Sequence, residues 1–148
     1  MAAHKIYTIG FTGKSAREFF NLLNSTDARY LADTRLNNNS QLAGFTKKGN
    51  IEYFVENLTR LQYIELPLLA PEKEMFQEYR KEGDWDLYES RYVELLERRS
   101  ASQNIEPSLL EDGVILLCSE RTPEKCHRRL AAEYLKASHF PEVDILHL

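Results

Sequence analysis

The feature that most constrains the fold is a short apolar run followed by a polar loop. Val114 to Leu117 is continuously apolar, and polar residues begin at Cys118. A run this short favours a strand over a helix, and its lack of alternation indicates a strand covered on both faces. We therefore expect a central, buried strand of a parallel sheet at residues 114–117.

A helix is expected soon after this strand. Thr122 is a suitable N-cap, Pro123 suits the first helical position, and Glu124 is an anion where the helix macrodipole favours one. The loop between strand and helix lies at the carboxyl end of the strand, where open α/β sheets bind their ligands. It carries both cysteines of the chain, Cys118 and Cys126, with a carboxylate, a histidine and several arginines.

This loop resembles the signature of the uncharacterised family catalogued as domain of unknown function 488. The matching pieces are Cys118-x-Glu120, Cys126-His127-Arg128, a first strand ending in Ile9-Gly10-Phe11-Thr12, and a second strand ending in Asp33-Thr34-Arg35 with Ser40 and Phe45 downstream. The family name implies no reaction. The chemistry therefore has to be inferred from the residues themselves.

Strands and helices alternate along the rest of the chain. We expect further strands at 5–11, 28–33, 63–66 and 143–148, and helices at 15–24, 51–60, 71–82, 84–102 and 123–138. Residues 36–49 and 101–112 are expected to be loops.

This alternation predicts one α/β domain over residues 1–148, a three-layer sandwich. We expect a mostly parallel five-stranded sheet with helices on both faces, Rossmann-like or flavodoxin-like, with strand order 3-2-1-4-5. The carboxyl ends of the first, second and fourth strands would then be neighbours. Residues 10–14, 33–35 and 118–128 would share one crevice.

Charge and composition exclude some classes of protein. The net charge of −4 argues against a broad basic face for nucleic acid, although a local basic pocket remains compatible with it. Two cysteines, no recognisable leader and no apolar run of membrane length predict a soluble cytoplasmic protein without a membrane partner. No particular cofactor is indicated.

The glycine-rich turn after the first strand has two interpretations. Gly13-Lys14-Ser15 before a helix is typical of a phosphate-binding P-loop, but that motif requires a glycine at position 8, which is Thr8. We therefore favour a turn in which Ser15 caps the helix. A weaker anion site at the helix start, with Lys14 beside it, remains compatible with the sequence.

The two cysteines allow four interpretations. A helix start, His127 and Arg128 would lower a thiol pKa, which favours a nucleophile. A metal pair lacks the spacing of structural zinc sites, and only Asp33 or His127 is placed to complete it. A reducing cytoplasm disfavours a disulfide, although thiols at the two ends of one loop could be neighbours. Both cysteines are equally well explained as small buried hydrophobes.

Carboxylates and aromatic residues are also ambiguous. Asp33 and Glu120, paired across the crevice, would divide acid and base roles, whereas ion pairs with Arg35 or Arg128 would make them structural. His127 lies on the apolar face of its helix and is either a core residue or part of the site. We interpret the aromatic residues Trp85, Tyr88 and Tyr92 as helix packing.

Together these features favour an enzyme whose crevice binds a small anionic ligand. The ligand is expected to bear phosphate and to be a nucleotide or a nucleic-acid end. The candidate catalytic residues are Cys118, Glu120, Asp33, Cys126 and His127, and the candidate ligand-binding residues are Gly10, Thr12, Arg35, Ser40 and Arg128. The alternatives are a non-catalytic ligand- or partner-binding module that uses the same pocket, and a metal-dependent hydrolase.

Overall fold

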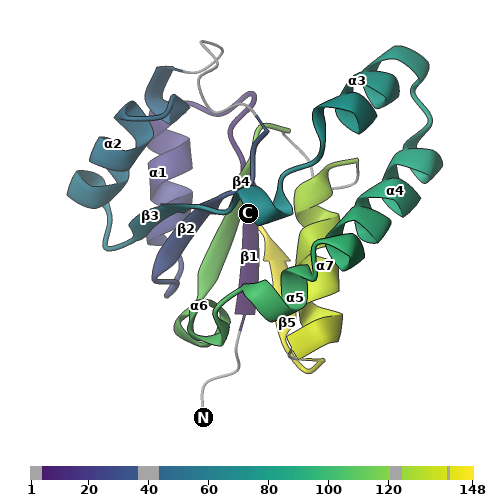
Figure 1. The fold of residues 1–148 in the computed structure, drawn as a ribbon. Coiled ribbons are helices and arrows are strands. Elements are labelled where there is room, and N and C mark those ends of the chain that lie inside the picture. Colours follow the sequence, from purple (N-terminus) through teal and green to yellow (C-terminus); the bar gives the residue numbers. More distant parts are fainter. Residues whose placement is uncertain (1–4, 37–43, 121–124, 140) are drawn as a thin grey trace.

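In the computed structural model the chain folds around one five-stranded sheet (Figure 1). The structure describes residues 5–36, 44–120, 125–139 and 141–148. The strands are β1 (Lys5–Gly10), β2 (Tyr30–Asp33), β3 (Gln62–Glu65), β4 (Val114–Cys118) and β5 (Asp144–His147). All neighbouring pairs are parallel, which confirms the predicted α/β class.

The strand order is β3-β2-β4-β1-β5, so the predicted order 3-2-1-4-5 is wrong. β4 lies between β2 and β1, with Ile115 in register with Leu31 on one side and Tyr7 on the other. All five side chains of β4 are buried, as the unbroken apolar run predicts. Hydrophobic pattern alone shows that β4 is interior, but it does not choose between two interior positions.

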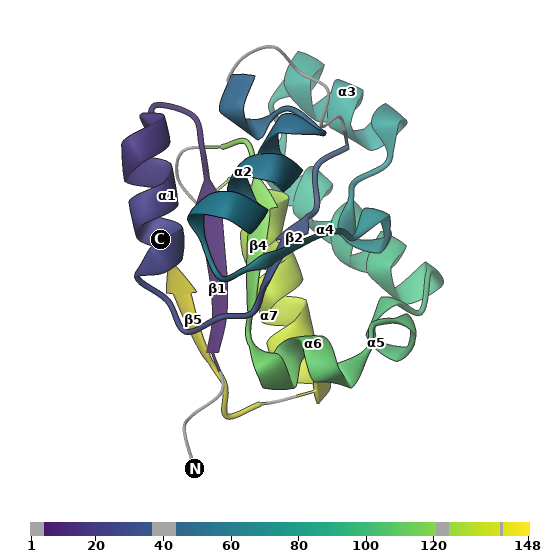
Figure 2. The same cartoon turned by 90° about the vertical axis from the view of Figure 1, so that its left-hand side faces the viewer.

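The helices cover the two faces of the sheet. Their bounds are α1 (Ala16–Asn24), α2 (Asn50–Leu58), α3 (Lys73–Glu82), α4 (Trp85–Arg98), α5 (Ala101–Asn104), α6 (Pro107–Asp112) and α7 (His127–His139). Figure 2 looks onto the face of the sheet that carries α1 and α2. Helices α3, α4 and α7 lie behind the sheet, on its opposite face. This arrangement confirms the three-layer sandwich.

The side chains of β4 alternate between two hydrophobic cores. Ile115 and Leu117 face α1 and α2, whereas Val114 and Leu116 face α4 and α7. Alternate strand residues point to opposite faces, so one strand supplies both cores. No alternation of polarity is visible because neither face of β4 meets water.

Several local predictions are confirmed by the helix termini. Ser15 caps α1, because its Oγ accepts a hydrogen bond from the Glu18 N–H at 3.1 Å and the Glu18 side chain returns to Ser15. This capping box is the helix-capping turn that we favoured over a P-loop. Gly83 adopts a left-handed conformation between α3 and α4, as expected for a glycine that joins two helices.

Two predictions about the chain near β4 are wrong. Residues 101–112 form the short helices α5 and α6 instead of a loop, because helices of four and six residues are too short to display a 3.6-residue period. α7 begins at His127, and Lys125 and Cys126 before it are not helical. The expected cap Thr122 and first residue Pro123 lie outside the described residues.

The segment predicted as an unassigned loop, residues 36–49, is described only in part. Gly44–Thr46 forms a 3₁₀ turn, η1, that packs against α2. Across the described ranges, every helix is too short or too polar to cross a bilayer.

The central position of β4 predicts a large stability difference between two leucines. Leu117 is fully buried in β4, whereas Leu146 in edge strand β5 is 41% exposed. Leu117→Ala is expected to lower the free energy of unfolding by about 2–5 kcal/mol because it leaves a cavity in a packed core. Leu146→Ala is the matched control and should cost less than about 1 kcal/mol. Urea denaturation measures both, and equal losses would contradict the central placement.

Candidate functional site

The carboxyl ends of β1 and β4 form the topological switch point of the sheet. After β1 the chain turns to α1 on one face, and after β4 it turns to α7 on the opposite face. Loops that leave neighbouring strands in opposite directions commonly open a ligand crevice. The predicted crevice is therefore expected between residues 10–13 and residues 118–128.

Direct contacts close the inner part of this crevice. The Thr12 N–H donates to the Ser119 carbonyl oxygen at 3.1 Å, which joins the two loops. Gly10 lies against the Glu120 carbonyl and the Arg128 guanidinium, and a Cβ at this position would overlap both. Gly10 is thus required for the close approach of the two loops.

Arg128 holds the loop after β4 in place. Its side chain is completely buried, and Nη1 donates to the Glu120 carbonyl oxygen and to Sγ of Cys118, the latter at 3.5 Å. A guanidinium carries its positive charge at any physiological pH. The sulfur of Cys118 therefore lies beside a permanent cation.

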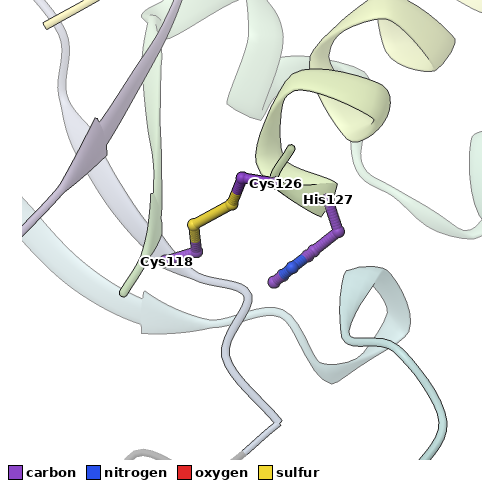
Figure 3. Close-up of side chains that lie close together, drawn as sticks. All are labelled: Cys118, Cys126 and His127. Atoms are coloured by element: carbon purple, nitrogen blue, oxygen red, sulfur yellow. A yellow bond between two sulfur atoms is a disulfide. The ribbon is translucent and has the colours of Figure 1, made fainter. Parts of the chain in front are cut away.

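Cys118 and Cys126 are joined by a disulfide (Figure 3). Both residues are buried, with Cys118 at the end of β4 and Cys126 immediately before α7. The disulfide is one of the four interpretations that the sequence allowed, and the one that a reducing cytoplasm disfavours. Cys118 at the end of β4 and Cys126 before α7 bring their sulfurs side by side, as thiols at the two ends of one loop can be.

His127 is held in one orientation by β2. Its Nε2 donates to the Thr34 carbonyl oxygen at 2.8 Å, and Thr34 Oγ1 lies 3.1 Å from the same nitrogen. A carbonyl only accepts, so Nε2 carries the proton and Nδ1 carries the lone pair. Burial, the largest effect, and the positive charge of Arg128 lower the pKa of His127 from 6.5 to about 4, although the hydrogen bond to Thr34 acts to raise it. The imidazole is therefore neutral at pH 7.

A small pocket opens beside these groups, between the loop after β4 and helices α3 and α4. We call it the β4 pocket. Its lining residues are Phe76, Tyr79, Trp85, Tyr88, Cys118, Ser119, Glu120, Lys125, Cys126 and His127. The cavity has a volume of about 40 Å³, enough for a few waters or the reacting group of a ligand but not for a whole nucleotide.

The aromatic wall of the β4 pocket is also part of the core. Trp85 stacks on Tyr88 with ring centroids 5.2 Å apart, Tyr79 lies 5.0 Å from Tyr88, and Tyr92 approaches the ring of His127 at 5.7 Å. Tyr88 and Tyr92 are buried. Helix packing, as we predicted, accounts for these aromatic residues, and part of the same cluster borders the cysteines.

Asp33 and Arg35 form a separate buried cluster. Asp33 accepts hydrogen bonds from Nε and Nη2 of Arg35 at 2.9 and 2.8 Å and from the Tyr63 hydroxyl at 2.6 Å. Arg35 also donates to the Thr46 carbonyl oxygen and lies over the ring of Phe11. Burial, followed by the hydrogen bond to Asp33, raises the pKa of Tyr63 above its usual value.

The structure thus brings together some of the predicted site residues and separates others. Cys118, Glu120, Cys126 and His127 line the β4 pocket, and Arg128 contacts Cys118 from behind. Asp33 is absent from the described lining. Its carboxylate forms an ion pair with Arg35 and accepts a hydrogen bond from Tyr63, so it has the structural role that we considered for it as an alternative. Ser40 lies outside the described residues.

Two contributors escaped the sequence analysis. Thr34 is buried at the end of β2, and its carbonyl sets the tautomer of His127. Its position between Asp33 and Arg35 was a usable signal, since it places a polar residue at the carboxyl end of a strand. Lys125 is exposed at the pocket, directly before Cys126, and is the cation of the lining set.

Three side chains of the β4 pocket form a potential metal-binding group. The donor atoms of Cys118, Cys126 and His127 lie within 4.8 Å of one another, and all three residues are buried (Figure 3). Imidazole nitrogen and thiolate sulfur, which these two cysteines offer once their disulfide is reduced, are ligands that zinc prefers.

Comparison with known proteins gives one family. The family model described as "Domain of unknown function DUF488" matches residues 15–135, which include β2 to β4, both cysteines and most of α7. The first-strand segment Ile9–Thr12, part of the resemblance noted in the sequence, lies outside the matched range. No curated protein and no solved structure matches the chain.

The contact at Gly10 predicts a specific sensitivity to a single methyl group. Gly10→Ala is expected to lower the free energy of unfolding by at least about 2 kcal/mol, because the new Cβ overlaps the Glu120 carbonyl and Arg128. Gly44→Ala is the matched control, since open space surrounds Gly44; it should change stability by less than about 0.5 kcal/mol. Chemical denaturation measures both changes, and a stable Gly10→Ala variant would contradict the close approach.

The buried imidazole predicts a pH dependence of stability. Between pH 6.5 and about 4 the unfolded chain protonates His127 but the folded chain does not. The stabilisation is therefore complete above pH 6.5 and is lost as the pH falls toward 4, by roughly 3 kcal/mol in total. Denaturation of the wild type and of His127→Gln from pH 7 to pH 4 measures this loss. Parallel curves for the two proteins would contradict it.

Proposed function

We propose that this chain, which belongs to the DUF488 family, is an enzyme that acts on a small anionic ligand with the reduced Cys118 as its nucleophile. The observation that carries the proposal is the contact of Arg128 Nη1 with Cys118 Sγ at 3.5 Å, in the wall of the β4 pocket. A neighbouring guanidinium stabilises a thiolate over a thiol. The disulfide to Cys126 is then the oxidised, inactive form.

The charges around the pocket favour a negatively charged ligand. Among the described lining residues Lys125 is a cation and Glu120 is the carboxylate, and the Arg128 guanidinium contacts the Cys118 sulfur. In this proposal Glu120, which is exposed and lines the pocket, does the acid or base work. The limited space admits the reacting group of a phosphate-bearing ligand while the remainder lies outside.

The Asp33–Arg35 cluster has a structural role in this proposal. The Arg35 guanidinium bonds to both carboxylate oxygens of Asp33 and to the Thr46 carbonyl oxygen. Such a bidentate, buried pair is costly to break by removal of one partner. It fixes the end of β2, including the Thr34 carbonyl that orients His127.

Two alkylating reagents that differ only in charge test the proposal. In the variant Cys126→Ser, free of metal, Cys118 is the remaining thiol, and its rates with iodoacetate and iodoacetamide are compared. Both reagents attack the thiolate, so the ratio of the two rates isolates the charge of the pocket. The ratio of the iodoacetate rate to the iodoacetamide rate should be about fivefold higher for Cys118 than for free cysteine. This factor corresponds to the ~1 kcal/mol of attraction between two opposite unit charges 4 Å apart in water.

Matched lysine variants locate the effect. Lys125→Ala should reduce the ratio, whereas Lys136→Ala, in the last turn of helix α7 and so far from Cys126, should leave it unchanged. Inorganic phosphate should slow both reagents. A ratio equal to that of free cysteine, without protection by phosphate, would refute the anionic ligand. A Cys118 thiol no faster than free cysteine with the neutral reagent would refute the nucleophile.

A further inference from the structure

We infer that the reduced chain binds a thiophilic divalent cation, typically Zn²⁺, through the sulfurs of Cys118 and Cys126 and an imidazole nitrogen of His127. The inference shares the reduced cysteines with the proposed function but does not require a nucleophilic Cys118. A chain that carries the cation uses Cys118 as a ligand, and a metal-free chain leaves it reactive.

The positions of the three donors fit such a cation. They lie within 4.8 Å of one another at the two ends of one loop. Two thiolates on a tetrahedral zinc ion lie about 3.8 Å apart, since each Zn–S bond is about 2.3 Å. The Cα atoms of Cys118 and Cys126 are 7.7 Å apart, wider than the 4.4–6.8 Å of most disulfides. This spacing leaves room for an ion between two separated sulfurs.

The hydrogen bond of His127 also fits a metal ligand. Ligating histidines nearly always donate their second ring N–H to a carbonyl or a carboxylate, which fixes the ring and its tautomer. His127 makes this bond from Nε2 to the Thr34 carbonyl oxygen at 2.8 Å. Nδ1 therefore carries the lone pair that a metal requires.

A divalent cation meets the charge requirement of the two thiolates. Two thiolates in a buried position carry two negative charges, which need positive charge nearby. The Arg128 guanidinium supplies one positive charge and remains a hydrogen-bond donor to a coordinated sulfur. A divalent ion then leaves the site with one net positive charge, which suits an anionic fourth ligand. The cation thus completes a site that already contains two sulfurs, an oriented imidazole and a donor to one sulfur.

The fourth coordination position would face the β4 pocket, because all three ligands line it. Structural zinc sites are closed by four protein ligands, whereas catalytic sites have three and keep one position for water or substrate. The Cys-x7-Cys-His spacing, which argued against a closed structural site, is compatible with an open one. An oxygen of a small anion is the kind of ligand that this position would accept.

Cobalt provides a direct test with the full chain. The untagged protein is reduced, stripped of metal with a chelator, desalted and titrated with Co²⁺ alone. We expect one equivalent to bind, with thiolate-to-cobalt charge-transfer absorption and the visible bands of tetrahedral cobalt, and Zn²⁺ should abolish both signals. The oxidised chain should bind none, and reduction should restore binding, so the test does not depend on a variant that folds.

Variants identify the ligands. Cys118→Ser, Cys126→Ser and His127→Gln should each weaken cobalt binding by at least roughly a hundredfold, the upper range for loss of a residue that merely supports a ligand. His139→Gln, at the other end of α7, is the matched control and should bind normally. Circular dichroism confirms that each variant is folded.

The outcomes separate this inference from the proposed function. Absence of thiolate-to-cobalt absorption in the reduced wild type would overturn the inference, and so would full affinity in a folded His127→Gln variant. Neither result affects the rate ratio of iodoacetate to iodoacetamide, which is measured on metal-free protein. Conversely, a sluggish Cys118 thiol with tight cobalt binding would refute the nucleophile and leave the metal site standing.

Discussion

The burial of one guanidinium organises the carboxyl ends of β1 and β4, where the candidate site lies. Arg128 lies in the first turn of α7, has no solvent exposure, and donates to both the Cys118 sulfur and the Glu120 carbonyl oxygen. A buried charge requires such partners, because its desolvation is costly. Glu120, whose carbonyl accepts from Arg128, lies against Gly10, and the disulfide joins Cys126 to Cys118 at the end of β4. The cysteine pair and the β4 pocket follow from this packing.

The chemistry of the site is concentrated on one loop, and β2 contributes to it indirectly. The Asp33–Arg35 pair fixes the end of β2, the Thr34 carbonyl orients His127, and His127 lies beside the cysteines. The crevice expected between β1 and β4 is closed by backbone contact, so the accessible space lies on the opposite side of the loop, against α3 and α4. At the carboxyl end of β4, the sulfurs of the two cysteines and the imidazole of His127 therefore line one small pocket.

Much of the architecture was predictable because it rests on local patterns. The apolar run at 114–117, the cap at Ser15 and the break at Gly83 each express a backbone preference of a few consecutive residues. The strand order was not predictable, since the apolar pattern of β4 is the same whether β4 lies between β1 and β5, as we expected, or between β1 and β2, as it does. Two further features also depended on contacts that no local pattern encodes: the disulfide between Cys118 and Cys126, and the binding of the Asp33 carboxylate by Arg35 and Tyr63.

By itself, the sequence determined the α/β class, the parallel sheet, the buried central strand and the loop that carries the reactive groups, because hydrophobic period and helix capping are properties of neighbouring residues. Only the tertiary structure decided which reactive groups meet. Hydrogen bonds between residues 93 positions apart, such as the one from His127 to Thr34, are set by strand order and crossover direction. The same residues in another strand order would place His127, Cys118 and Arg128 in different surroundings.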